Sequence, residues 1–292
     1  MKTNWIILLC LGLWACQYDQ QTFAQDSSKV TAVKVSTVNP VKFDASQDIL
    51  EKRFPTPQGY QRTSVDQASF AYYLRQLPLQ PHGAKVHYFD GRLKMRSDVH
   101  AAVVKMDVGK RDLQQCADAI MRLRAEYLYK TQQYDQLHFN FTNGFNADYR
   151  QWRQGKRIKV DGNKVSWYKV SQNQTSYQSF RRYLNMVFAY AGTLSLEKEL
   201  QRVDITEIQI GDVFIQGGSP GHAIIVVDVV EKIDSEERLF LLAQSYMPAQ
   251  EIHILNNPQS EQLSPWFSNQ IKGRLATPEW IFEIDDLRRF EE

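Results

Sequence analysis

One cysteine, Cys116, stands alone in the part of the sequence that we expect to fold. The chain has three cysteines, and the other two, Cys10 and Cys16, belong to an N-terminal export segment. An unpaired thiol adds nothing structural to an exported protein, so Cys116 is a candidate nucleophile. The alternative is a small buried hydrophobic residue, which is the commoner role of a free cysteine.

Cys116 lies where a helix is expected to begin. Asp112 and Gln115 are suitable cap residues, and apolar residues then recur at helical spacing to about Lys130. Free N–H groups at a helix start lower the pKa of a thiol, whereas burial on the apolar face raises that pKa. The sign of the net shift bears directly on whether Cys116 is a reactive nucleophile or a core residue.

His222 is the expected partner of the thiol. An imidazole beside a thiolate forms an ion pair and can deliver a proton to the leaving group. His222 opens an apolar strand directly after the segment 217–221, whose glycines let the backbone approach a ligand. His100, at the head of the strand before the cysteine helix, is the alternative base.

A third polar residue is needed to orient the imidazole. Gln244 and Ser245 both interrupt the apolar run LFLLAQSY of the following strand. Consecutive strand residues point to opposite faces, so only one of the two can point at His222. We expect further residues near these groups to contact substrate, namely Gln115, Ser219, Gly221 and Ser245.

Metal, cofactor and nucleic-acid sites are not expected. Glu251 and His253 share a strand face, but no third ligand follows at a recognised zinc spacing. The sequence has no Walker or dinucleotide-binding glycine pattern. Its 35 Lys and Arg against 33 Asp and Glu leave a net charge of +2, with no basic stripe that would neutralise phosphates.

The elements that must position these residues follow an α+β order. The periodicity predicts helices over 64–77, 112–130, 176–191 and 195–200. Strands are predicted over 85–89, 99–108 and 136–141, in a hairpin over 158–167, and over 210–215, 222–230, 239–246, 251–255 and 278–284. The run 222–230 is apolar on both faces except at Asp228, as expected for a strand covered on both sides. Helices first and sheet second indicate an α+β domain.

The N-terminus indicates export. Lys2 precedes an apolar segment over 5–15 that has the layout of a secretory signal peptide and is too short to span a bilayer. The segment ends in Leu13-Trp14-Ala15-Cys16, which resembles a bacterial lipoprotein signal. We therefore expect a signal peptide over 1–15, a lipid on Cys16 that anchors the protein to a membrane of the cell envelope, on the periplasmic side, a flexible tether over 16–48 and a single domain over 49–292. The alternative is cleavage after Ala24 and secretion without a lipid.

The order of the chemical residues resembles a known group of enzymes. A cysteine at a helix start is followed by Gly211-Asp212-Val213 opening a strand, Gly221-His222-Ala223 opening the next, and a polar residue one strand on. Over 112–248 this order resembles the NlpC-type and CHAP-type cell-wall peptidases and amidases of the papain-like fold. Relative to those families, a hairpin and two helices are inserted between cysteine and histidine, and further residues precede the domain.

The resemblance implies a role for each residue. Cys116 would be the nucleophile, with its own backbone N–H in the oxyanion hole, His222 the base and acid, and Gln244 the orienting residue. Segments such as FPTPQGY, SPGHAIIVVDV and LLAQSYMPAQEIHIL also resemble an exported bacterial family described only as a domain of unknown function.

The expected function is a cell-envelope cysteine hydrolase that cuts an amide bond in peptidoglycan or a related peptide through an acyl-enzyme. The first alternative is a non-catalytic envelope lipoprotein that binds glycan or peptide in the same cleft, with Cys116 buried. The second alternative is a structural or assembly component, which would have no cleft.

Overall fold

The computed structural model describes residues 43–170 and 172–291. The expected signal peptide, Cys16 and most of the expected tether lie outside the described residues. The helices are α1 (Leu50–Arg53), α2 (Phe70–Arg75), α3 (Cys116–Lys130), α4 (Tyr149–Arg153), α5 (Tyr177–Tyr190) and α6 (Thr193–Glu199), with short 3₁₀ turns η2 (Ile205–Glu207) and η3 (Ile284–Asp286). The strands are β1 (Tyr60–Arg62), β2 (His100–Val103), β3 (Lys156–Asp161), β4 (Lys164–Lys169), β5 (Leu200–Arg202), β6 (Val213–Gln216), β7 (His222–Lys232), β8 (Arg238–Gln244), β9 (His253–Leu255), β10 (Phe267–Ser268), β11 (Arg274–Ala276), β12 (Ile281–Glu283) and β13 (Leu287–Phe290).

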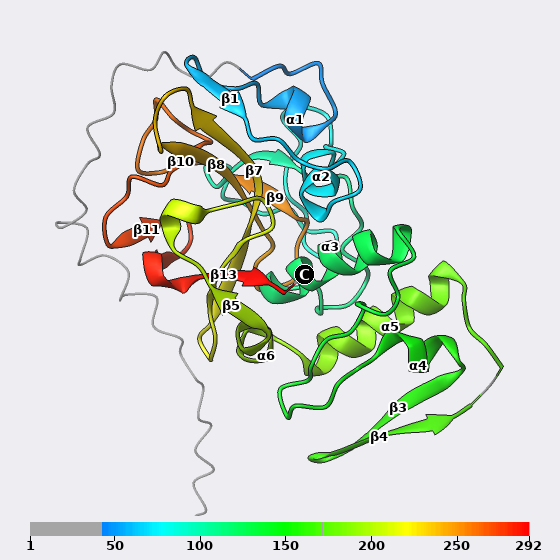
Figure 1. Cartoon of the computed structure of the whole chain (residues 1–292). Helices are drawn as coiled ribbons and strands as arrows, with labels where there is room; N and C mark the ends of the chain where they lie inside the picture. The colour runs from blue at the N-terminus through cyan, green and yellow to red at the C-terminus, as the bar shows by residue number, and fades with distance from the viewer. Residues whose placement is uncertain (1–42, 171, 292) are drawn as a thin grey trace, which may run out of the picture. The chain divides into compact units, whose positions relative to one another are not determined.

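A nine-stranded sheet forms the centre of the fold. Its order is β2-β9-β8-β7-β6-β13-β5, with β1 also paired to β7 and β10 to β8. The pairings of this sheet in the described residues are antiparallel. α2 and α3 pack against β7, and Figure 1 shows them on one side of the sheet. The predicted α+β class with a mainly antiparallel sheet is confirmed.

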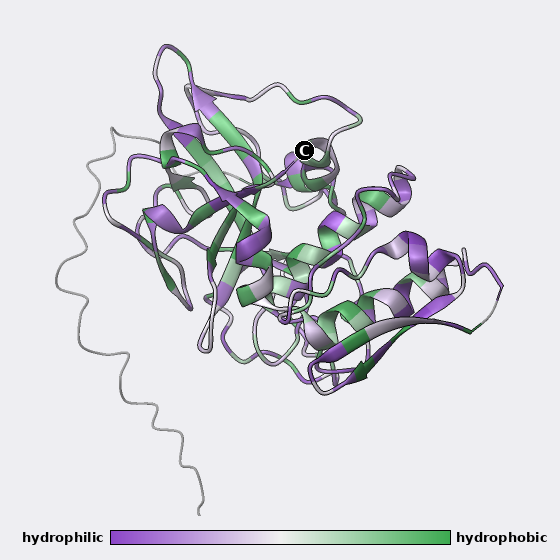
Figure 2. Ribbon diagram, turned by 60° about the horizontal axis from the view of Figure 1, so that its bottom comes forward, coloured by the Kyte–Doolittle hydropathy of each residue, from purple (hydrophilic) through white to green (hydrophobic). Residues whose placement is uncertain are grey.

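β7 is buried on both faces, as its sequence predicts. Ala223, Ile225 and Val227 belong to the core between sheet and helices. Ile224 and Val226 belong to a second core on the other face. Figure 2 shows hydrophobic residues running along the central strands. His222 is the first residue of β7, and the burial of both faces holds this strand rigidly in place.

Asp228, the polar exception in β7, is held by two arginines. It is fully buried, and Arg75 Nε donates to its Oδ1 at 2.7 Å. Arg62 Nη1 donates to its Oδ2. Arg62 comes from β1 and Arg75 from the end of α2. The buried carboxylate therefore joins two N-terminal elements to the central strand.

One of the four predicted helices has nearly the expected bounds, since α5 runs from the cap Ser176 to Tyr190. α3 ends at Lys130 as predicted but begins at Cys116 rather than at 112, because Gln115 is its N-cap. The starts of the other two predicted helices are also wrong. α2 begins after Ser69, whose Oγ accepts from Tyr72 N–H at 3.1 Å, because a turn at Asp66 occupies the expected first turn.

The short helix α6 also starts earlier than predicted. Gly192 is its N-cap, and Ser195 lies inside the helix. The hydroxyl of Ser195 accepts from Gly192 N–H at 3.0 Å, so Ser195 caps the helix from within its first turn.

Two predicted strands are absent from the described residues. In 85–89 the chain turns back at Gly91, and only isolated bridges form, between His87 and Leu93 and between Tyr88 and Gln250. In 136–141 the backbone N–H of Asn140 donates to Glu199 Oε1 at 2.7 Å rather than to a strand neighbour. In both segments local turns and side chains satisfy the backbone groups that a strand would pair.

The insertion between α3 and β6 forms its own group of elements. The predicted hairpin is confirmed as β3 and β4, with Gly162 and Asn163 between the strands. α4 and α5 pack beside it, and Trp152 Nε1 in α4 donates to Ser179 O in α5 at 3.1 Å. Figure 1 shows these elements together, beyond α3 from the sheet. The insertion therefore does not interrupt the packing of α3 on β7.

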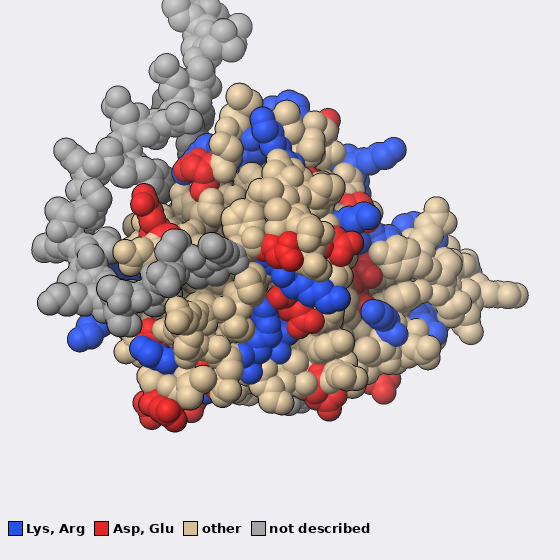
Figure 3. Space-filling model, turned by 90° about the horizontal axis from the view of Figure 1, so that it is seen from above, with Lys and Arg blue, Asp and Glu red and all other residues tan. Residues whose placement is uncertain are grey.

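The charged surface is mixed. On the face drawn in Figure 3, Lys and Arg side chains are interspersed with Asp and Glu side chains. Among the residues that the structure describes, no helix combines the length and apolar character needed to cross a membrane.

Candidate active site

Cys116 is the first residue of α3, and the predicted cap residues hold this helix start. The backbone N–H of Gln115, the N-cap residue, donates to Asp118 Oδ2 at 3.1 Å. The side chain of Gln115 donates to Asp112 Oδ1 at 3.0 Å. The two contacts fix the thiol at the positive end of the helix dipole.

The packing of α3 on β7 brings the cysteine to the strand that carries the histidine. The backbone N–H groups of Cys116, Ala117 and Ala223 all lie close enough to the Cys116 Sγ to favour its charged form. Ala223 directly follows His222 in β7. The thiol therefore lies against the start of the strand that carries His222. The His222 ring itself contacts Trp280 and Phe282, which belong to the core on the other face of the sheet from Ala223.

His222 is oriented by Gln244. Its side chain is buried, and its Nε2 lies 2.9 Å from Gln244 Oε1 in the neighbouring strand β8. An amide oxygen only accepts hydrogen bonds, so Nε2 carries the proton. Within residues 43–170 and 172–291, Nδ1 of His222 has no hydrogen-bond partner. The nitrogen that can accept a proton is therefore Nδ1.

Aromatic rings enclose the imidazole. The ring centroid of His222 lies 4.7 Å from that of Tyr246, 5.3 Å from Trp280 and 5.8 Å from Phe282. Trp280 is itself fixed, because its Nε1 donates to Gln216 Oε1 at 2.9 Å. The rings restrict the rotation of the imidazole and exclude water from it.

Burial favours the neutral forms of Cys116 and His222. Burial raises the pKa of the Cys116 thiol to about 11, with a further rise from Asp118, against the lowering by the backbone N–H groups. Burial also lowers the pKa of His222 to about 4, with a smaller rise from the Gln244 hydrogen bond. Of the opposing effects that the sequence left open at Cys116, burial is the larger. At neutral pH Cys116 is therefore a thiol and His222 a neutral imidazole.

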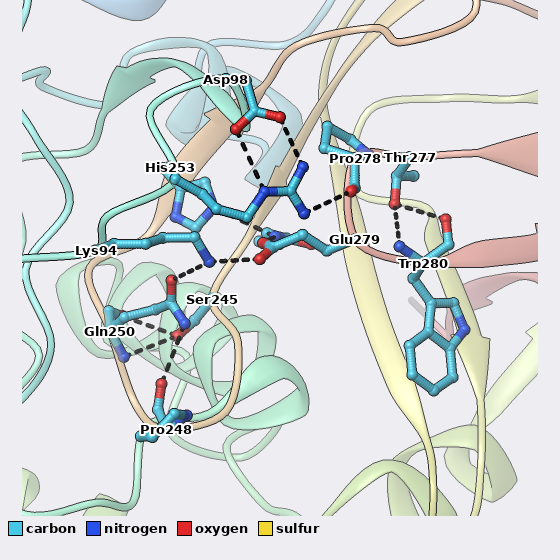
Figure 4. Close-up of polar contacts among 12 residues, drawn as sticks. Lys94, Asp98, Ser245, Pro248, Gln250, His253, Thr277, Pro278, Glu279 and Trp280 are labelled. Atoms are coloured by element: carbon cyan, nitrogen blue, oxygen red, sulfur yellow. Dashed lines mark hydrogen bonds and ion pairs between the residues drawn. The ribbon is translucent and has the colours of Figure 1, made fainter. Parts of the chain in front are cut away.

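A polar network continues behind Gln244. Its Nε2 donates to Glu279 Oε2 at 2.8 Å and lies 3.3 Å from His253 Nε2. Lys94 Nζ donates to Glu279 Oε1 at 2.6 Å and to Gln250 Oε1 at 3.0 Å. Figure 4 shows Lys94 between Glu279 and Gln250. Lys94 and Glu279 form an ion pair whose side chains are 5% and 11% exposed.

Ser245 points away from the histidine, as the strand alternation requires of one of the two candidates. The oxygen of its hydroxyl lies 3.0 Å from Gln114 O and 2.8 Å from Gln250 O, so the single O–H is shared between these two acceptors. These bonds join the end of β8 to the loop that precedes α3. Ser245 thereby supports the position of the cysteine helix, and its expected contact with substrate remains a prediction.

The glycine-rich segment before His222 is tightly packed at one position. A Cβ on Gly221 would lie 2.5 Å from Thr193 Oγ1 and 2.7 Å from Gly218 O, so only glycine fits there. Ser219, two residues earlier, is exposed. Contacts of Ser219, Gly221 and Gln115 with substrate remain predictions.

His100, the alternative base, lies in a different environment. Its Nε2 lies 3.1 Å from Ala84 O, and its ring packs edge-on against His253 at 5.9 Å. Within the described ranges no hydrogen bond joins Cys116 to His100 or to His222. His222 is the histidine of β7, the strand on which α3 packs.

Sequence reasoning missed Lys94, Glu279 and the contact of His253. Lys94 lies in an irregular loop, and Glu279 lies within the predicted strand 278–284 but before β12, which begins at Ile281. The sequence around Lys94 and Glu279 does not predict that either side chain is buried. Their charges can be buried only because the two residues pair with each other in the folded chain. His253 could have been noticed from the sequence, because it lies in a strand of apolar residues that is expected to be buried. A buried polar side chain there needs a hydrogen-bond partner.

Cavities lie near the site and away from it. A cavity of about 610 Å³ is bounded by Lys94 and Glu279 and by Tyr88, Arg92, Leu93, Met95 and Arg96. Another, of about 550 Å³, lies between α2, α3 and β13 and contains none of the candidate residues. In the described part of the chain, no group of three or more His, Cys, Asp or Glu side chains is placed to hold a metal ion.

Comparison with known proteins assigns the chain to a family. No curated protein matches the chain, and no solved structure matches it. The model of the family described as domain of unknown function 4846 matches residues 50–289, which include every described residue of the candidate site. The chain belongs to this family.

Proposed function

We propose that the chain is a cell-envelope cysteine hydrolase of papain-like type that cleaves an amide bond through an acyl-enzyme. The observation that carries the proposal is the bond between His222 Nε2 and Gln244 Oε1, which leaves Nδ1 unprotonated on the strand whose next residue, Ala223, lies at the thiol. The proposed nucleophile, base and orienting residue then come from a helix start and two adjacent strands. Thiol catalysis uses residues in these three roles.

The proposed reaction has two half-steps. The Cys116 Sγ attacks the amide carbonyl carbon while His222 Nδ1 takes the thiol proton. The imidazolium then gives that proton to the amine, the C–N bond breaks and a thioester remains. Water, deprotonated by His222, releases the acid and restores the thiol. The backbone N–H of Cys116 is the proposed donor to the oxyanion.

The neutral state of the site is compatible with this route. A thiol with a pKa of about 11 does not attack as a preformed thiolate at neutral pH. General-base removal of its proton during attack does not require one. The thiolate is instead formed when substrate displaces water and presents the carbonyl.

We expect alkylation of Cys116 to be slow at neutral pH and to accelerate as the pH rises. The pKa of the thiol is raised from 9.0 to about 11. Well below both values, two pKa units correspond to about 100-fold less thiolate than at an ordinary cysteine. The measurement is the rate of iodoacetamide labelling of the full chain between pH 6 and 10, with peptide mapping to separate Cys116 from Cys10 and Cys16.

The urea-unfolded chain is the control for this labelling, since its thiol has an ordinary pKa. Rapid labelling of folded Cys116 below pH 7 would contradict the expected neutral pair, because it would require a thiolate–imidazolium pair.

The proposed substrate is peptidoglycan or a related envelope peptide, and the proposed anchor is a lipid on Cys16. The substrate follows from the resemblance to cell-wall peptidases and amidases, and the anchor follows from Leu13-Trp14-Ala15-Cys16 at the end of the export signal. In a bacterial host, radiolabelled palmitate is expected to enter the wild-type chain and not the Cys16→Ser variant. Equal incorporation into both, or none into either, would show that Cys16 carries no lipid.

The test of the proposed activity uses purified peptidoglycan. The full chain is incubated with it, and the soluble products are separated and identified by mass spectrometry. The expected products carry new amine and carboxyl ends at one type of amide bond, and alkylating Cys116 beforehand stops their release. Products that form equally after alkylation would contradict the proposal.

A non-catalytic binding role is the second candidate, and the raised pKa of Cys116 favours it. A buried thiol that stays protonated is also what a core residue would show. In that case the chain would retain peptidoglycan fragments without releasing new ends. The same incubation, followed by sedimentation, separates binding from hydrolysis.

A further inference from the structure

The partners of Gln244 determine which end of its amide faces the histidine. A carboxylate only accepts hydrogen bonds, so the group that contacts Glu279 Oε2 at 2.8 Å is the amide NH₂. His253 Nδ1 lies 2.8 Å from Glu251 O, which also only accepts, so Nδ1 of His253 carries a proton. Burial lowers the pKa of His253 to about 3, and its Nε2 is therefore an unprotonated acceptor.

Both amide hydrogens of Gln244 thus have acceptors on the side away from His222. One points at Glu279 and the other at His253 Nε2, 3.3 Å away. The amide oxygen must then point at His222, where it accepts from Nε2–H. A neutral imidazole has one N–H, so a proton on Nε2 leaves Nδ1 free to accept the proton of the thiol.

We infer that Glu279, held by Lys94, is a positioning residue that fixes the tautomer of His222 through the Gln244 amide. The inference rests on the proposed function for its catalytic meaning. The tautomer itself is a property of the folded chain and can be measured without substrate.

The ion pair of Lys94 and Glu279 determines which end of the Gln244 amide faces His222. Lys94 Nζ occupies Glu279 Oε1 and Gln250 Oε1, so the second carboxylate oxygen of Glu279 is presented to Gln244. Gln250 is oriented in turn, because its Nε2 donates to Pro248 O at 3.1 Å. Among the described residues, the charged and titratable groups around His222 and Gln244 are Lys94, Glu279, His253 and Tyr246, and Tyr246 in turn lies near Cys116.

The isosteric variant Glu279→Gln is expected to reverse the amide. Lys94 can only donate, so it binds the oxygen of the new amide and turns the new NH₂ toward Gln244. Two NH₂ groups cannot bond each other, so Gln244 is expected to turn its oxygen to residue 279 and its NH₂ to His222, with loss of its contact to His253 Nε2. Nε2 of His222 then has to accept, and the proton moves to Nδ1.

The double variant Lys94→Met with Glu279→Gln is expected to restore the original tautomer. Without the lysine, the amide at residue 279 is free to turn its oxygen to Gln244. Removing both members of a buried ion pair also leaves no unpaired charge, so this variant is expected to fold. Glu283→Gln is the matched control, since Glu283 is exposed and pairs with Arg274 on the surface.

The measurement is the ¹⁵N chemical shift of the histidine ring nitrogens in the full chain, recorded by long-range ¹H–¹⁵N correlation. The wild type and Glu283→Gln are expected to show His222 protonated on Nε2 and His253 on Nδ1. Glu279→Gln is expected to show His222 protonated on Nδ1, and the double variant on Nε2 again. A wild-type His222 protonated on Nδ1, or an Nε2 proton that persists in folded Glu279→Gln, would overturn the inference.

Hydrolysis distinguishes this inference from the proposed function. Glu279→Gln is expected to lower kcat by roughly 10²–10⁴-fold, the usual contribution of a positioned base, with little change in KM. The double variant is expected to recover most of that loss. If the tautomers change as expected while even the wild type hydrolyses nothing, the positioning role stands and the proposed function fails. If the wild type hydrolyses and Glu279→Gln keeps both its activity and its tautomer, the positioning role fails alone.

Discussion

Replacing Cys116 by Ala is expected to abolish amide hydrolysis and to leave the melting temperature of the chain almost unchanged. The variant removes the only atom that forms the thioester, so the expected loss of kcat is on the order of 10⁴–10⁶-fold. The thiol is partly buried at a helix start and has no disulfide partner, so its loss leaves only a small cavity. Product release from peptidoglycan and thermal unfolding give the two readings.

Cys116→Ser is the matched variant, because it keeps the size of the side chain and replaces the thiol by a weaker nucleophile. It is expected to fold and to be nearly as inactive as Cys116→Ala. Activity in either variant comparable with that of the wild type would exclude Cys116 as the nucleophile.

Asp228→Asn is expected to give the largest loss of stability. The carboxylate is fully buried and pairs with Arg75 and Arg62, whose side chains are 5% and 21% exposed. Removing one charge of a buried ion pair leaves the others without compensation and costs about 3–5 kcal/mol in the free energy of unfolding. Urea titration of the full chain measures this change.

Asp98→Asn is the control for Asp228→Asn. Asp98 pairs with Arg96 at the surface, where the two side chains are 66% and 52% exposed. Pairs of this kind contribute about 0–1 kcal/mol. Similar losses in the two variants would contradict the structural role of Asp228 in joining β1 and α2 to the central strand.

The elements of the candidate site could largely be predicted from the sequence. The cap at Gln115 and the apolar face to Lys130 are local signals, and they place Cys116 at the start of α3. The apolar run after His222 is also local, and it predicts a strand covered on both faces. Strand alternation separates Gln244 from Ser245, and the structure shows Gln244 as the residue that contacts His222.

The surroundings of these residues could not be predicted in the same way. The pKa of Cys116 depends on how densely β7 and α3 enclose the thiol, which the helix start alone does not reveal. Lys94 and Glu279 meet only in the folded chain, since 94 lies before α3 and 279 before β12. The false strands over 85–89 and 136–141 have strand-like side chains, but turns and side chains satisfy their backbone groups.

The proposed function depends on a covalent bond between Cys116 and the acyl part of the substrate. The most direct measurement is the intact mass of the full chain, quenched with acid during turnover of a soluble peptidoglycan fragment and then mapped by proteolysis. We expect an added mass equal to the acyl fragment on Cys116 in the wild type, and no such mass on Cys116→Ala. Cleavage of the fragment by the wild type with no adduct on Cys116, together with equal cleavage by Cys116→Ala, would contradict the proposed function.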